Sequence, residues 1–146
     1  MAQIELIPHV PETGSYRIFY PKHFVLEETE DNIVTITSPE TSSNLTLTGY
    51  QASLDVDEKV LTDFFQEFTG NYIPESEIIK EISNKRIFLE RRFKKDNVNW
   101  VWWGLAEENQ IILVSANSED QLSVEDYNLY RFMIDGMEIY PSAFEE

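Results

Sequence analysis

Residues 85–107, "KRIFLERRFKKDNVNWVWWGLAE", decide the fold. Both halves, 85–95 and 98–107, are rich in the aromatic and aliphatic residues typical of β-strands. Asp96 and Asn97 between them favour a two-residue hairpin turn, because Asn tolerates a positive φ. The register of this hairpin decides which way each of the three tryptophans points.

One face of the hairpin carries Trp100 and Trp102 together with Arg91. Counting back from the turn places Arg91 opposite Trp102 and Leu89 opposite Gly104, where the glycine leaves room for a large neighbour. A guanidinium over an indole ring is worth on the order of 0.5–2 kcal/mol. Two interpretations stay open: both tryptophans are core residues, with Arg91 reaching past them to an edge, or Arg91, Trp100 and Trp102 line a partly open pocket.

The opposite face carries Trp103 with Glu90 and Arg92. These three residues are candidate partner contacts, with Trp103 as the apolar anchor, because exposed tryptophan is enriched at binding hot spots. The same register predicts that Arg91→Ala lowers stability more than Arg92→Ala, since only Arg91 shares its face with Trp100 and Trp102.

The rest of the chain alternates strand and helix patterns. Residues 55–70, "DVDEKVLTDFFQEFTG", predict a helix with one apolar face and a cap at Asp55 or Asp57. Residues 123–139, "SVEDYNLYRFMIDGMEI", predict a second helix capped by Ser123. The second apolar stripe comprises Val124, Tyr127, Tyr130, Ile134 and Met137. Further strands are expected at 16–21, 24–28, 33–39, 44–52, 76–83 and 110–116.

This order predicts a single α+β domain over residues 1–146, a twisted antiparallel β-sheet of about six to eight strands flanked by two amphipathic helices. Residues 1–14 are expected to be poorly structured, and 140–146 to form a C-terminal tail.

The amino-acid composition excludes several classes of partner and site. The formal net charge of −16 opposes binding to nucleic acid or an anionic membrane and favours a basic protein partner, although acidity also serves solubility. The absence of cysteine excludes disulfides, thiolate chemistry and common zinc sites. No apolar run reaches the roughly 18 residues of a membrane span, and the N-terminus does not resemble a secretory signal. These features indicate a cytoplasmic protein.

Catalytic and metal-binding patterns are not found. His9 and His23 are the only histidines, and neither has ligand spacing with another histidine. The acid-rich stretches 27–31 and 55–58 do not follow a calcium-loop pattern. No phosphate-binding glycine loop or nucleophile elbow is present. No catalytic, cofactor-binding or metal-binding residue is therefore predicted, and no cofactor.

Charge clusters supply the other candidate contacts. The acids expected in turns are Glu27, Glu28, Glu30, Asp31, Asp55, Asp57 and Glu58. Six of the 11 basic residues lie between positions 85 and 95. This basic cluster has two open interpretations: protection of a sheet edge against pairing, or contact with a smaller acidic patch on the partner.

The segment "YRIFYPKHFVLEETEDNIVTITSP" (16–39) and the order of elements resemble the PsbP-like superfamily. In that family an early strand ends at a Tyr-Pro turn before a short strand, here "FYPKHFVLEE", although Phe24 replaces a frequent tryptophan. The superfamily includes photosystem II extrinsic proteins, the Ran-binding nuclear-import factor of the Mog type and bacterial chaperones of type VI secretion effectors. The resemblance implies a bacterial protein that binds other proteins and is not an enzyme.

Together these features predict a non-catalytic protein-binding module of adaptor, secretion-chaperone or toxin-neutralising type, either a monomer or a homodimer. The alternatives are an enzyme with a carboxylate-lined pocket and a housekeeping structural domain without a tight partner.

Overall fold

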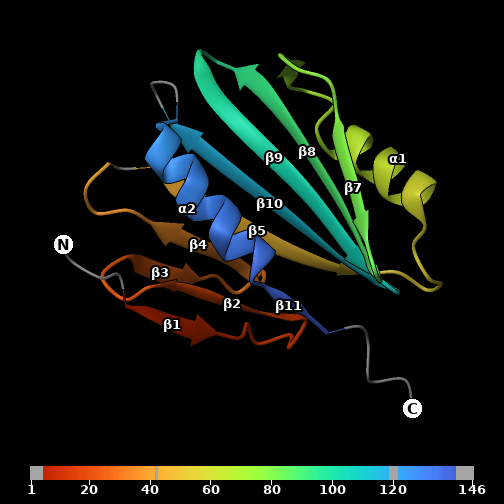
Figure 1. Cartoon of the computed structure of the whole chain (residues 1–146), viewed down its shortest axis with the longest axis horizontal. Helices are drawn as coiled ribbons and strands as arrows, with labels where there is room; N and C mark the ends of the chain where they lie inside the picture. The colour runs from red at the N-terminus through yellow and green to blue at the C-terminus, as the bar shows by residue number, and fades with distance from the viewer. Residues whose placement is uncertain (1–4, 42, 119–121, 141–146) are drawn as a thin grey trace.

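The computed structural model describes residues 5–41, 43–118 and 122–140. Its elements follow the order β1 (Leu6–His9), β2 (Tyr16–Pro21), β3 (Val25–Glu28), β4 (Ile33–Thr37), β5 (Asn44–Gln51), α1 (Glu58–Phe68), β6 (Ile73–Pro74), β7 (Ile79–Ser83), β8 (Arg86–Lys95), β9 (Val98–Glu107), β10 (Gln110–Ser118), α2 (Val124–Asp135) and β11 (Glu138–Ile139). Figure 1 shows the long strands β8, β9 and β10 crossing the middle of the molecule.

The main sheet has eight strands in the order β3-β4-β5-β10-β9-β8-β6, with β7 also paired to β8. All its pairings are antiparallel. A second antiparallel sheet has the order β1-β2-β11. The predicted α+β class, with a mostly antiparallel sheet and two helices, is confirmed; the second sheet was not predicted.

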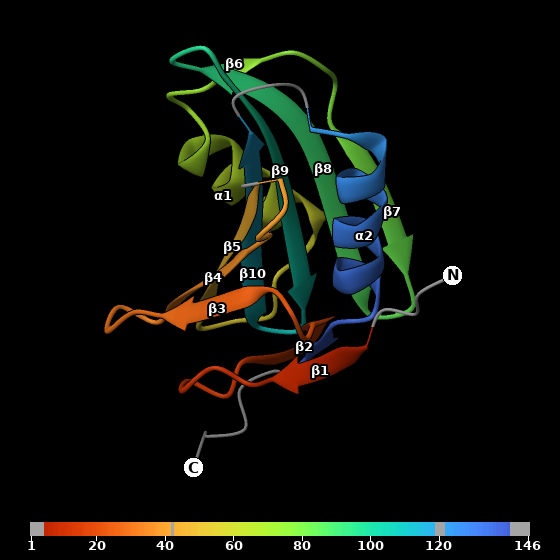
Figure 2. The ribbon, with the colours of Figure 1, turned by 90° about the vertical axis from the view of Figure 1, so that its left-hand side faces the viewer.

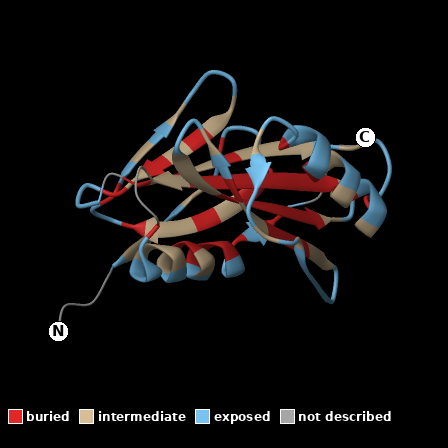
Figure 3. Cartoon of the chain, turned by 90° about the horizontal axis from the view of Figure 1, so that it is seen from above, coloured by how far each residue is buried: buried red, intermediate tan, exposed pale blue. Residues whose placement is uncertain are grey.

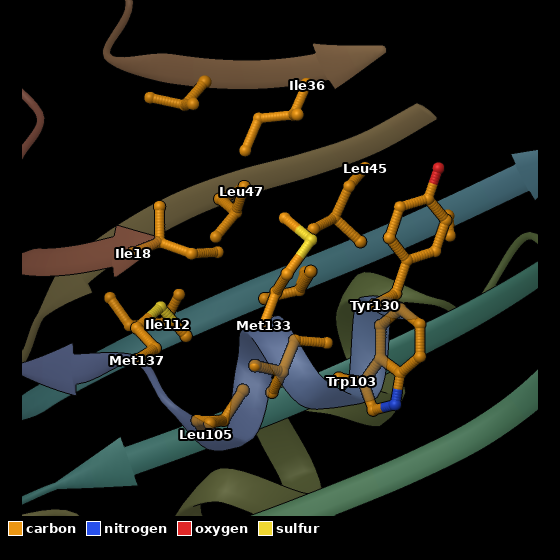
Figure 4. Packing of buried hydrophobic residues seen from close by; sticks show 14 of the residues in the cluster. Ile18, Ile36, Leu45, Leu47, Trp103, Leu105, Ile112, Tyr130, Met133 and Met137 are labelled. Carbon is orange, nitrogen blue, oxygen red and sulfur yellow. The ribbon is translucent and has the colours of Figure 1, made fainter. Parts of the chain in front are cut away.

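The two helices lie on opposite faces of the main sheet (Figure 2). On one face α1 contributes Leu61 and Phe65 to a cluster with Leu89, Phe93 and Trp102 of the sheet. On the other face, α2 and the second sheet cover a larger cluster (Figure 4), which includes Ile18, Leu45, Leu47, Trp103, Leu105, Ile112, Tyr130 and Met133. The central strands are therefore buried on both sides, as the burial colours in Figure 3 also show.

Both helices begin where the capping residues predict. The Asp57 side chain accepts a hydrogen bond from the Val60 amide at 2.8 Å, and Ser123 accepts one from Asp126 at 3.0 Å. The second helix ends at Asp135 instead of near residue 139, because the chain passes Gly136 and adds β11 to β2. Val124, predicted in its buried stripe, is 74% exposed.

The expectation that residues 1–14 are poorly structured is wrong for Leu6–His9, which pair with β2. Pro8 lies inside this strand and interrupts the sequence pattern expected of a strand. An edge strand accepts a proline, which has no N–H, at a position that faces solvent and needs no donor. The two-residue strand β6 is too short to give an alternating pattern and was also missed. Of the expected tail, residues 141–146 lie outside the described part of the chain.

Candidate protein-interaction surfaces

The predicted hairpin register is confirmed at every pair. Arg91 lies opposite Trp102, Glu90 opposite Trp103 and Leu89 opposite Gly104. Asp96 and Asn97 form the turn with φ of 55° and 65°, the left-handed values that a two-residue hairpin turn needs at both positions.

Trp103 is not a surface anchor, and that prediction is wrong. Its side chain is 0% exposed and lies in the cluster under α2, where its ring packs against Tyr127 at 6.3 Å between centroids. Glu90, predicted as a contact beside it, is 4% exposed. The face that alternation alone assigned to solvent is buried because α2 covers it. Trp103 and Glu90 are therefore core residues.

Glu90 is the centre of a buried polar cluster between α2 and the main sheet. The Glu90 carboxylate accepts hydrogen bonds from Trp103 Nε1 at 2.8 Å, from the Tyr127 hydroxyl at 2.8 Å and from Arg131 Nη1 at 3.2 Å. Burial, together with the hydrogen bond to Glu90, raises the pKa of Tyr127, which keeps its hydroxyl a donor. The cluster joins α2 to β8 and β9, so its first role is structural.

Arg131 was missed by sequence reasoning. It also lies 3.8 Å from a Glu81 carboxylate oxygen and 3.4 Å from one of Asp135. Only the Asp135 spacing, four residues along one helix, is visible in the sequence. The pairing with Glu90 depends on how α2 docks against β8, and no local pattern encodes it.

Trp100 and Trp102 share one face of the hairpin as predicted, and this is the face that α1 covers. Their rings are stacked at 6.2 Å between centroids. Tyr72 packs edge-on against both, and Phe68 of α1 packs against Trp102. Trp102 is 7% exposed and Trp100 half-buried. Since aromatic neighbours fill the space around these rings, the core interpretation is favoured over a pocket.

Arg91 lies on the same face, but its guanidinium stands 5.7 Å over the Phe93 ring instead of over Trp102. Its Nε donates to the backbone oxygen of Ser76 at 2.7 Å. Arg91 therefore ties β8 to the segment between β6 and β7.

The first acidic stretch spans the end of β3 and the β3–β4 turn. The expectation that its acids lie in a turn is wrong for Glu27 and Glu28, because both belong to β3 and pair with β4. Glu28 is half-buried there and accepts hydrogen bonds from His9 Nε2 at 3.0 Å and from the Glu12 amide at 2.8 Å. Glu27, Glu30 and Asp31 are exposed, and their carboxylates make no ion pair within the described residues. This turn presents three uncompensated charges to solvent.

The second acidic stretch leads into α1. Asp57 is occupied as the helix cap, and Glu58 forms an ion pair with Lys80 at 2.6 Å. Asp55 is exposed and has no cation within reach among the described residues. Of the seven predicted acidic contacts, four thus remain uncompensated: Glu27, Glu30, Asp31 and Asp55.

Seven of the 11 basic residues form ion pairs with carboxylates of the same chain: Arg17, Lys22, Lys59, Lys80, Lys85, Arg86 and Arg131. The other four are Arg91, Arg92, Lys94 and Lys95, which all lie at the end of β8. Charge is therefore distributed unevenly over an acidic molecule.

A surface hollow of about 730 Å³ is lined by Ser83, Asn84, Lys85, Arg86, Glu107 and Asp135. Arg86 there is bound to Glu107 at 2.7 Å and to the backbone oxygen of Met137 at 2.6 Å, so its donors hold the end of α2. Within residues 5–41, 43–118 and 122–140, no group of three or more His, Asp or Glu side chains could hold a metal ion. Neither helix in this part of the chain is long and apolar enough to cross a membrane.

No protein-family model matches the sequence, and no curated protein matches it. The fold does have relatives. The solution structure of cyanobacterial PsbP (CyanoP) from Synechocystis sp. PCC 6803 superposes with a TM-score of 0.71 over 95% of both chains, at 10% identity. The fold is PsbP-like.

A second structure with a similar fold is a crystal structure of a protein from Bacteroides thetaiotaomicron VPI-5482, with a TM-score of 0.62 and 8% identity. The match covers 95% of this chain and 50% of that one. The resemblance inferred from the sequence is therefore confirmed at the level of the fold. At these identities the likeness concerns the fold, and the residues that act must be argued from this chain.

Proposed function

We propose that this PsbP-like chain is a non-catalytic protein-binding module of adaptor, secretion-chaperone or toxin-neutralising type, acting in the cytoplasm as a monomer or homodimer. One observation carries the proposal: exposed, uncompensated carboxylates at the β3–β4 turn and before α1, in a chain of net charge −16. Such a field attracts a basic protein surface and opposes nucleic acid and anionic membranes.

The contact residues that support this role are Glu27, Glu30, Asp31 and Asp55. Glu30, Asp31 and Asp55 lie outside the regular strands, and Glu27 is an exposed residue of the edge strand β3, so a partner reaches all four without disturbing the core. Opposite fields raise association rates by roughly 10- to 1,000-fold, and salt above about 0.1 M screens the effect.

The test is capture of a stoichiometric partner from native extract, followed by affinity measurements between 50 and 500 mM salt. The contact variant carries Glu27→Gln, Glu30→Gln, Asp31→Asn and Asp55→Asn. A matched control carries Glu40→Gln, Glu67→Gln, Glu77→Gln and Glu125→Gln, four exposed acids elsewhere. Both variants remove the same amount of charge.

We expect the contact variant to lose about 10-fold or more in affinity at 50 mM salt and the control to lose much less. An affinity that does not change with salt and is equal for both variants would contradict the proposal. The acidic residues would then serve solubility and not partner binding. Absence of any partner would favour the housekeeping alternative, and turnover of a small molecule would favour the enzyme alternative.

A further inference from the structure

The end of β8 carries a set of cations that no carboxylate of residues 5–41, 43–118 and 122–140 neutralises. Arg91, Arg92, Lys94 and Lys95 have no carboxylate within 4.0 Å among the described residues, although the sequence holds 27 acids. Every other basic residue has such a partner. We call these four residues the cationic hairpin end.

Aromatic rings contact three of these cations without removing their charge. The Arg91 guanidinium lies 5.7 Å from the Phe93 ring centroid, that of Arg92 lies 5.0 Å from the Tyr127 centroid, and Lys95 Nζ lies 4.7 Å from that of Tyr72. An ion pair would saturate the donors, whereas a ring face leaves N–H groups open. Arg92 and Lys95 are therefore still able to bind a carboxylate.

Alternation along β8 divides the four cations between its two faces. Arg92 and Lys94 share the α2 face, and Arg91 and Lys95 share the α1 face. Residues two apart on a strand are separated by about 6.5–7 Å, which matches alternate carboxylates of an extended acidic segment. Arginine adds a planar fork that binds carboxylate through two hydrogen bonds.

Protection of a sheet edge does not explain these charges, because β8 is not an edge strand. It pairs with β9 along its whole length and with β6 and β7 on its other side. Between those two pairings, the Arg92 amide donates to Ser76 Oγ at 3.0 Å, and the Glu75 amide donates to the Arg92 oxygen at 2.8 Å.

We propose that the cationic hairpin end binds an acidic segment of a partner protein. The inference rests on the proposed protein-binding function and adds a second contact of opposite charge to the acidic turns. A protein segment fits better than a nucleic acid because an apolar side chain lies beside the cations. Ile73, which lies directly opposite Lys94, is 66% exposed and offers contact to an apolar side chain of the partner.

The probe is a peptide of eight glutamates, titrated into ¹⁵N-labelled protein at 150 mM salt. We expect saturable shifts of the amides of residues 91–99 and of the Trp100 indole. Lys94→Gln with Lys95→Gln should weaken binding by about 5- to 30-fold, since two exposed ion pairs are lost. The control, Lys22→Gln with Lys59→Gln, removes the same charge from two exposed lysines elsewhere and should change affinity by less than about 2-fold.

No saturable shift up to millimolar peptide, shifts centred elsewhere, or equal losses in both variants would overturn the inference. Tighter binding of an eight-residue thymidine oligonucleotide at the same amides would also overturn it, in favour of nucleic acid. The titration needs no native partner, so its outcome is independent of the test of the proposed function. The peptide can fail to bind while the four-acid contact variant still loses affinity for its partner. The peptide can also bind while that variant loses no affinity.

Discussion

Glu90 is the residue on which the packing of α2 depends most. Its carboxylate is buried and accepts hydrogen bonds from Trp103, Tyr127 and Arg131. Glu90→Ala leaves a buried indole N–H and a guanidinium without their acceptor, and we expect it to lower the free energy of unfolding by about 3–5 kcal/mol. Glu90→Gln, which keeps one oxygen acceptor, should cost less. Chemical denaturation measures both, and equal costs would mean that the oxygen acceptor kept by glutamine contributes nothing once the charge of Glu90 is lost.

Arg91 and Arg92 are neighbours with different roles. Arg91 Nε donates to Ser76 O at 2.7 Å, whereas among the described residues the Arg92 side chain makes only the contact with the Tyr127 ring. Arg91→Ala should therefore lower stability by about 1–2 kcal/mol, and Arg92→Ala by about 0.5–1 kcal/mol. Denaturation midpoints of the two variants give the comparison. A larger loss for Arg92→Ala would show that the ring contact outweighs the hydrogen bond.

Tyr130 makes stability depend on alkaline pH. Burial raises its pKa to about 12 in spite of a hydrogen bond with Ser43. A tyrosine with a raised pKa in the folded state stabilises the fold fully below its unfolded pKa of about 10. This contribution, at most about 2–3 kcal/mol, is lost as pH rises from about 10 to 12.

The control for that prediction is Tyr130→Phe. Unfolding measured between pH 8 and 12 should show a shallower fall in stability for the phenylalanine variant. Buried Tyr16, whose pKa is also raised by burial, remains in both proteins. Identical slopes would mean that Tyr130 is not the group that titrates.

At the scale of elements, the contact of α1 with β9 depends on Gly104. A Cβ atom at this position would lie 3.0 Å from Phe65 Cδ1, inside the buried cluster. Gly104→Ala should push α1 away from the sheet and lower stability by about 1–3 kcal/mol. Gly136→Ala is the matched control, since its Cβ would meet only backbone oxygen at 3.5 Å, and it should change stability by less than about 0.5 kcal/mol. Thermal unfolding of the two variants measures the difference in stability. An unchanged stability of Gly104→Ala would show that α1 can shift to accommodate the added methyl group.

At the scale of the whole molecule, the net charge of −16 opposes compaction. Raising salt from 10 to 200 mM screens the repulsion among exposed carboxylates, so we expect stability to rise by about 1 kcal/mol, or roughly 2–5 °C in Tm. Calorimetry at neutral pH measures the shift. The four-acid contact variant should show a smaller rise than the unmodified protein. A fall in Tm with salt would mean that the chain's own ion pairs outweigh the repulsion.

The sequence by itself determined what depends on local periodicity and turn chemistry. The hairpin register follows from Asp96 and Asn97, the helix starts follow from Asp57 and Ser123, and the space at Gly104 follows from the register. These features rest on contacts between residues near in sequence or fixed by one turn. The order of such elements was also sufficient to indicate the PsbP-like fold.

Only the tertiary structure decided which surfaces remain exposed. Alternation separates Trp102 from Trp103 but does not say that both faces of the sheet are covered, because that depends on α2 and the second sheet docking from distant parts of the chain. The same docking buries Glu90 and brings Arg131 to it. Tertiary packing also brings Lys80 to Glu58 of α1 and leaves four basic residues without a carboxylate partner among the described residues. Burial and charge pairing are properties of the packed elements, so no single stretch of sequence contains them.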